Sequence, residues 1–183
     1  FHATWAGPYL TDVYGLAPAV MGNLLMLISF GRMLGNLTQG WIADRIIRSR
    51  VASTTLGLGI FAASWIPLAL WPDRLSVASL AALYGGGFGF ACVSLLLLFP
   101  ILRSKFSGQV AGTASGIVNL LSILGIAATQ QLFGALINRY PPAGGHYPPA
   151  AYQLMFRVGL GMAVAGWLIT VSAMRLPGGQ KEN

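Results

Sequence analysis

Residues 106–138 read FSGQVAGTASGIVNLLSILGIAATQQLFGALIN and contain no Asp, Glu, Lys or Arg. A helix that crosses a lipid bilayer needs about 20 mostly apolar residues, each adding about 1.5 Å of length, and this stretch is long enough. Membrane-spanning β-strands are only about 10 residues long and alternate apolar with polar side chains, which this stretch does not. It therefore predicts a transmembrane helix.

The rest of the chain repeats this pattern. Four further stretches lack charged residues: 13–31, 51–72, 75–102 and 158–174. We expect complete spans near 17–40, 51–71, 77–101, 110–137 and 152–174, preceded near 1–9 by a truncated span that ends near Tyr9. Turn-forming residues separate them at Gly7-Pro8, at Trp71-Pro72-Asp73 and in the Pro/Gly-rich segment 139–149. The predicted fold class is an all-α integral membrane protein, a helical bundle.

Composition supports the same class. Apolar residues make up 55% of the 183 residues and charged residues only 8%, whereas a soluble domain carries about a quarter charged residues. The net charge of +7 is spread along the loops and is not gathered with aromatic residues on one face, so we expect no nucleic-acid partner.

Basic residues also predict the orientation, because cytoplasmic loops of membrane proteins carry the excess of Lys and Arg. One side of the predicted bundle receives Arg45, Arg48, Arg50, Arg103, Lys105, Arg175 and Lys181, and the other receives Arg74 and Arg139. This asymmetry puts the first group and the C-terminus in the cytoplasm. Arg157 lies about a turn inside its span, where a long side chain can reach the interface.

Polar residues inside the spans are expensive unless they are paired or face water. Ser29, Arg32, Asn36 and Gln39 recur at helical spacing in one span, and Ser115, Asn119, Ser122 and Gln130 in another. We expect these stripes to line a water-accessible cavity, with Arg32, Asn36, Asn119 and Gln130 as candidate substrate contacts. For Arg32, the alternatives are a structural ion pair and a long side chain that reaches the inner interface. For Asn119 and Gln130, the alternative is hydrogen bonding between helices. The spaced pairs Gly31/Gly35 and Gly112/Gly116 predict close helix contacts.

The loop after the first complete span reads GWIADRIIRSR over residues 40–50. It matches the pattern G-x-x-x-D-R-x-x-R through Gly40, Asp44, Arg45 and Arg48. With this topology, the sequence resembles the major facilitator superfamily (MFS) of secondary transporters, in which the motif follows the second span of each half. Residues 5–16 are similar to the end of the seventh span, and residues 108–134 to the eleventh span of bacterial members.

The resemblance implies that residues 1–183 form the C-terminal half of a twelve-span transporter in a bacterial inner membrane. It implies transport of a small solute by alternating access, and the positive charge of Arg32 favours an anionic solute. The partners would be that solute, membrane lipids and an N-terminal six-helix half that this chain lacks. By analogy, Gly40, Asp44, Arg45 and Arg48 would form a conformational clamp at the cytoplasmic side, with Gly40 allowing close approach; topogenic charge alone is the alternative.

Two departures from the family pattern stand out. Arg32 occupies a position where related spans carry small or apolar residues, and no Asp or Glu lies within a predicted span. The visible half therefore offers no buried carboxylate for proton coupling. Four acidic residues and two histidines give no metal-ligand set, and we expect no cofactor and no enzymatic activity. A non-transporting MFS-like sensor or assembly subunit would keep the same sequence features and is the alternative function.

Overall fold

The computed structural model describes residues 1, 4–105 and 108–174, and within them all elements longer than an isolated bridge are helical. In chain order these elements are α1 (Ala6–Tyr14), α2 (Pro18–Trp41), η1 (Ile42–Ile47), α3 (Arg50–Ala63), α4 (Trp65–Leu70), α5 (Val77–Ala82), η2 (Leu83–Phe90), η3 (Ala91–Leu97), α6 (Leu98–Lys105), α7 (Gly108–Ile137) and α8 (Pro149–Met174).

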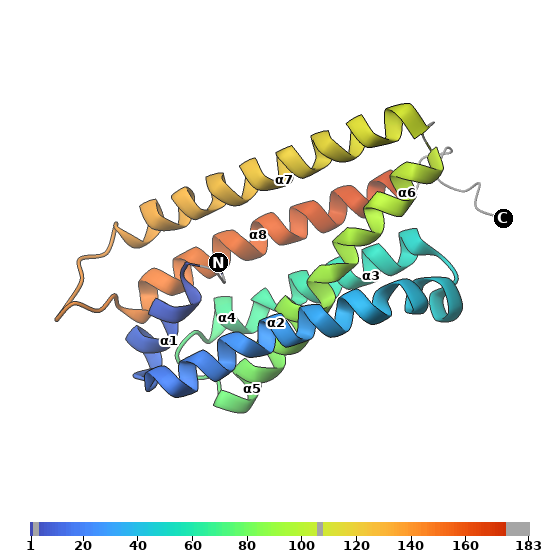
Figure 1. Ribbon diagram of the computed structural model, residues 1–183. Helices are drawn as coiled ribbons and strands as arrows, with labels where there is room; N and C mark the ends of the chain where they lie inside the picture. Colours follow the sequence, from blue (N-terminus) through green and yellow to red (C-terminus); the bar gives the residue numbers. More distant parts are fainter. Residues whose placement is uncertain (2–3, 106–107, 175–183) are drawn as a thin grey trace.

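Five helical segments are long and apolar enough to cross a membrane: Pro18–Ile47, Arg50–Leu70, Val77–Ile101, Val110–Ile137 and Pro149–Ser172. The predicted class, an all-α membrane protein, is therefore confirmed. Figure 1 shows the long helices lying roughly along one axis, with α7 beside α8. The α7–α8 connection and α1 lie at one end of the bundle, and the η1 turn lies at the other.

Helix α1 differs from the sequence-based expectation at both ends. It continues to Tyr14, so the segment expected to end near Tyr9 extends further. Gly7-Pro8, expected to form a turn, lies instead in the first helical turn, where the missing N–H of proline has no helical partner to lose. The helix ends at Gly15, whose φ of 59° places it in the left-handed region that glycine adopts without strain.

The second complete span is divided into α3 and α4 at Ser64. Pro67 explains the interruption, because it has no N–H to donate to the carbonyl oxygen four residues earlier. The Ser64 hydroxyl donates a hydrogen bond to the carbonyl oxygen of Ile60 at 2.8 Å. Trp65, the first residue of α4, lies in the buried core.

The third complete span leaves α-helical geometry in its middle, where the π-helix η2 is followed by the 3₁₀-helix η3. This is the part that packs most extensively against α2. A Cβ added at Gly31 would overlap the carbonyl oxygen of Gly85, and one added at Gly89 would come within 2.8 Å of the carbonyl oxygen of Ile28. The two backbones therefore touch without intervening side chains.

Only one of the two predicted glycine pairs makes such a contact. Gly35 faces Val93, whose Cγ2 would lie 2.9 Å from an added Cβ. Gly112 and Gly116 have no heavy atom of the described chain within 4 Å of an added Cβ. The Gly31/Gly35 pair thus joins α2 to the third complete span, whereas the Gly112/Gly116 surface of α7 is open.

Replacing Gly31 with Ala is expected to destabilise the bundle by about 1–3 kcal/mol, because the methyl group must push two backbones apart. Thermal unfolding of the detergent-purified protein measures the effect. Gly116→Ala is the matched control: it adds the same methyl group to a helix with open space around it. Equal melting temperatures for the two variants would contradict the proposed backbone contact.

Candidate functional site

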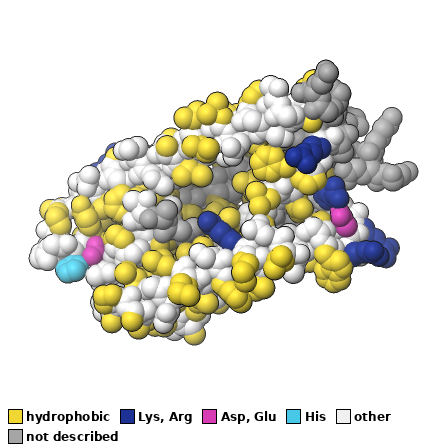
Figure 2. Space-filling model, viewed as in Figure 1, with side chains coloured by type: hydrophobic (Ala, Val, Ile, Leu, Met, Phe, Trp, Pro, Cys, Tyr) yellow, Lys and Arg dark blue, Asp and Glu magenta, His cyan; other side chains and the backbone are white. Residues whose placement is uncertain are grey.

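A cavity of about 650 Å³ opens between the helices, within the size range of small-molecule sites. Figure 2 shows a depression in the middle of the bundle with a Lys or Arg side chain beside it. The cavity is lined by Phe1, Leu25, Ile28, Ser29, Arg32, Phe61, Trp65, Cys92, Ile126, Thr129, Gln130, Phe133, Gly159, Met162 and Ala163. These residues come mainly from α2, α3, α4, α7 and α8, so the site depends on segments far apart in the sequence.

The glycine contact of α2 determines which of its residues reach the cavity. Ile28, Gly31 and Gly35 are buried on the side facing η2 and η3. Successive helical residues are rotated by about 100°, so Ser29 and Arg32 lie on the neighbouring face and line the cavity. Arg32 makes no hydrogen bond or ion pair with any residue that the structure describes. Among the described residues, its guanidinium group therefore has no protein partner.

The four candidate substrate contacts divide into two groups. Arg32 and Gln130 line the cavity from α2 and α7. Asn36 and Asn119 are exposed and are not among its lining residues. Gln39, the last member of the α2 stripe, is buried and its Nε2 donates to the carbonyl oxygen of Phe90 at 3.4 Å. Part of the stripe therefore holds helices together, and the substrate-binding role of the four residues stays a prediction.

Aromatic side chains form one wall of the cavity. The helical spacing of polar residues in the sequence did not predict this wall. Phe61, Trp65 and Phe133 line it, and the distance between ring centroids is 6.2 Å from Trp65 to Phe61 and 6.3 Å from Trp65 to Phe133.

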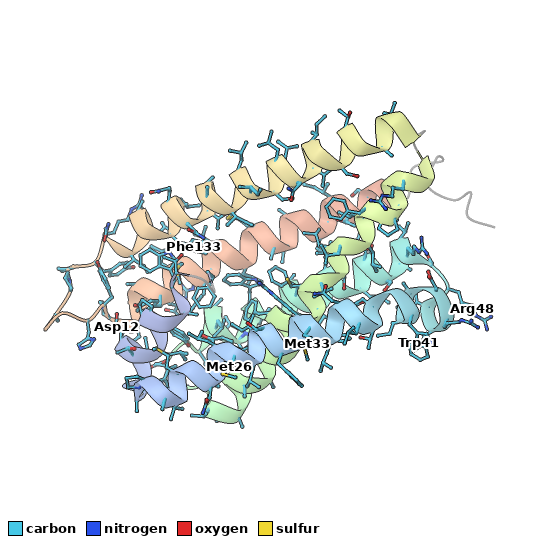
Figure 3. The ribbon with its side chains drawn as sticks, viewed as in Figure 1. Asp12, Met26, Met33, Trp41, Arg48 and Phe133 are labelled. Carbon is cyan, nitrogen blue, oxygen red and sulfur yellow. The ribbon has the colours of Figure 1, made fainter. Side chains whose placement is uncertain are left out.

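Figure 3 shows Phe133 on α7 and, at the other side of the bundle, Met26 and Met33 on α2. Both methionines are exposed and belong to the outer surface of the bundle.

The segment that carries the predicted clamp, expected to be a loop, instead continues α2 as the π-helix η1, and it forms its own ion pair. Asp44 accepts hydrogen bonds from Nε of Arg50 at 2.8 Å and from a terminal guanidinium nitrogen of Arg50 at 3.0 Å. Arg48 ends the π-helix η1 with a φ of 56°. Neither Arg45 nor Arg48 makes an ion pair with a described residue, and an added Cβ at Gly40 would meet no described atom within 4 Å. The close approach expected at Gly40 is thus not made within this part of the chain.

The charges at the two ends of the bundle differ. Figure 3 shows Arg48 at one end and Asp12 at the other, and Figure 2 shows most Lys and Arg side chains near the Arg48 end. Arg175 and Lys181, predicted to share that end, lie outside the described residues.

A carboxylate that sequence reasoning missed closes the opposite end. Asp12, on α1, accepts hydrogen bonds from the Tyr152 hydroxyl at 2.6 Å and the Tyr147 backbone N–H at 3.1 Å, and it pairs with Nδ1 of His146 at 2.8 Å. Its side chain is only 10% exposed. Burial raises the pKa of this carboxyl group, but the three partners together outweigh burial and hold the pKa below its ordinary value of 3.8. The partners are more than 130 residues away, so local sequence gave no signal.

Comparison with known proteins finds similarity to transporters. The chain is 27% identical over 149 residues to the glycerol-3-phosphate transporter of Bacillus subtilis, an alignment covering 77% of this chain and 32% of that protein. It is 32% identical over 121 residues to the arabinose-proton symporter of the same organism, covering 66% of this chain and 25% of that protein. The chain thus spans about a third or less of the length of these relatives. No family model matches, and neither does a solved structure.

These similarities are to membrane transporters rather than to enzymes. They support the resemblance to the MFS that the 40–50 loop indicated. Together with the five helices able to cross a bilayer, they define the chain as a multi-pass membrane protein similar to transporters.

The Asp12 cluster predicts acid sensitivity of the folded bundle. Because folding lowers the Asp12 pKa, its stabilising contribution is present above 3.8 and is lost as the pH falls through the lower folded-state value. Asp12→Asn is expected to cost about 1–3 kcal/mol at neutral pH. Melting temperatures of the two proteins, measured from neutral pH downward, should converge below the folded-state pKa; a constant difference at every pH would contradict this.

Proposed function

We propose that the chain is the C-terminal half of a secondary transporter and that the cavity beside Arg32 is part of its substrate path. The observation that carries this proposal is a cavity of about 650 Å³ within a set of helices able to cross a membrane, bordered by an arginine that has no ion pair among the described residues. The similarity to two transporters supports it. A charge inside a span is expensive, so an arginine without a partner fits a binding site better than a structural pair.

Transport would proceed by alternating access, with the cavity closed in turn from either side by an N-terminal six-helix half. The exposed apolar residues of α7 support a further helical layer on this face. Ile117, Leu120 and Leu124 are 54–57% exposed, and little of α7 is buried by the described chain. A second half would cover part of this surface, and membrane lipids would cover the remainder.

We assign the Arg48 end to the cytoplasm of a bacterial inner membrane, with the C-terminus on the same side. The excess of basic residues at that end supports this orientation. In this orientation, the Asp44–Arg50 pair lies where the two halves would separate and close. The clamp would work by exchange: Asp44 releases Arg50 when a partner from the first half arrives, and Gly40, Arg45 and Arg48 complete the contact.

Arg32→Ala is expected to reduce solute flux about tenfold or more, because a charge-assisted contact is lost from the cavity. Flux is measured in proteoliposomes with the full-length protein and a panel of small anions and sugars. Arg157→Ala is the matched control, since Arg157 is exposed on α8 and does not line the cavity. Equal flux in the two variants would contradict the role of Arg32, and absence of flux for every solute would favour the non-transporting alternative.

Asp44→Asn is expected to shift the protein towards the cytoplasm-open state, because Asn lacks the charge that would hold the first half in the closed state, after Asp44 has released Arg50. Cys92, the single cysteine of this chain, lines the cavity and reports its opening. A membrane-impermeant thiol reagent applied from either side should label it several-fold faster from the cytoplasm in the variant. Asp73→Asn, at the opposite end, is the control; unchanged labelling from both sides would rule out the clamp.

A further inference from the structure

The residues that line the cavity are mainly apolar and include a single basic side chain. Arg32 is the one cationic side chain among the described lining residues, and no carboxylate is among them. Arginine stays protonated at any physiological pH and presents five N–H donors. Ser29, Thr129 and Gln130 add polar groups, and most other lining side chains are apolar. A ligand that matches these walls carries one negative charge and a largely apolar body.

Trp65 provides a second, independent observation. Its side chain is 6% exposed, and its indole N–H is buried with no acceptor among the described residues. Tryptophan can only donate through this group, and an unpaired buried donor costs free energy. The six-membered edge of the ring packs against α8, because a Cβ added at Gly159 would lie 2.6 Å from Cζ3. The N–H is on the opposite edge of the ring, and Trp65 is among the residues that line the cavity.

The aromatic wall is suited to a flat ring. Trp65 lies 5.1 Å from Phe88, with the two rings at 85°, and Phe61 and Phe133 complete the wall on the cavity side. Edge-to-face packing of this kind holds the rings in fixed orientations. A further aromatic ring would extend the same arrangement without displacing polar groups.

We propose that the cavity binds an organic monoanion with an aromatic body, such as an aromatic carboxylate. The carboxylate would pair with Arg32, and the ring would lie against Phe61, Trp65 and Phe133 with the Trp65 N–H donating to an acceptor on the ligand. This rests on the proposed function, in that it names the substrate class for the same cavity. A sugar fits less well, because many of its hydroxyl groups would face apolar walls without hydrogen-bond partners. A phosphate dianion also fits less well, because Arg32 can balance only one of its two negative charges.

Binding is tested by protection of Cys92 in the full-length protein at neutral pH. N-Ethylmaleimide labels Cys92, and mass spectrometry of its peptide measures the rate. The probes are benzoate, benzyl alcohol, which keeps the ring without the charge, and acetate, which keeps the charge without the ring. Benzoate should protect Cys92 saturably, at a concentration about tenfold or more below that needed for either partial analogue.

Variants separate the two contacts. Arg32→Gln should weaken benzoate protection about tenfold or more, and Trp65→Phe, which removes only the N–H and part of the ring, should weaken it several-fold. Arg157→Gln should leave it unchanged. Size-exclusion profiles that match the parent protein show that each variant is folded, and a variant that fails this check is replaced by Phe133→Leu, which shortens the aromatic wall.

The outcomes distinguish this proposal from the broader one. The proposal that the cavity binds an aromatic monoanion would be overturned if benzoate did not protect Cys92, whether or not glycerol 3-phosphate or arabinose protected it. Flux of another solute in the same preparation would then leave the transporter proposal standing. Protection by benzoate without flux of benzoate would support the binding site and contradict transport.

Discussion

The backbone contact between α2 and η2 is the constraint on which the arrangement of this bundle depends. Gly31 and Gly89 let two helices approach until backbone atoms touch, and any side chain there would separate them. In lipid, where apolar surfaces gain little by leaving the solvent, such close packing supplies the attraction between helices. The same contact sets the rotation of α2 about its axis, and that rotation directs Ser29 and Arg32 into the cavity.

Much of the fold could be predicted from the sequence, because few backbone structures are stable inside a lipid bilayer. A charge-free stretch of sufficient length permits one structure in hydrocarbon, a helix whose backbone groups bond to each other. The same logic does not reveal local geometry. The π and 3₁₀ segments between Leu83 and Leu97 depend on how the chain packs against α2, and Pro8, which reads locally as a turn signal, is accommodated in the first turn of α1.

The candidate site was predictable only in its polar part. Helical spacing pointed to Arg32 and Gln130, which line the cavity, but equally to Asn36 and Asn119, which do not. Spacing defines a face of a helix, whereas the neighbours of that face come from tertiary packing. The aromatic wall around Trp65 was missed because an aromatic residue in an apolar span reads as lipid-facing or core, and nothing in its local sequence separates a cavity wall from either.

The Asp12 cluster also bears on the order in which the bundle is assembled. Its partners, His146, Tyr147 and Tyr152, follow it by more than 130 residues, so during synthesis α1 emerges long before they exist. Contacts of such long range form late. Until then the carboxylate has to remain hydrated, which the end of a helix at the membrane surface permits and the bilayer interior does not. The position of Asp12 thus suits a residue that completes the bundle after its other helices are in place.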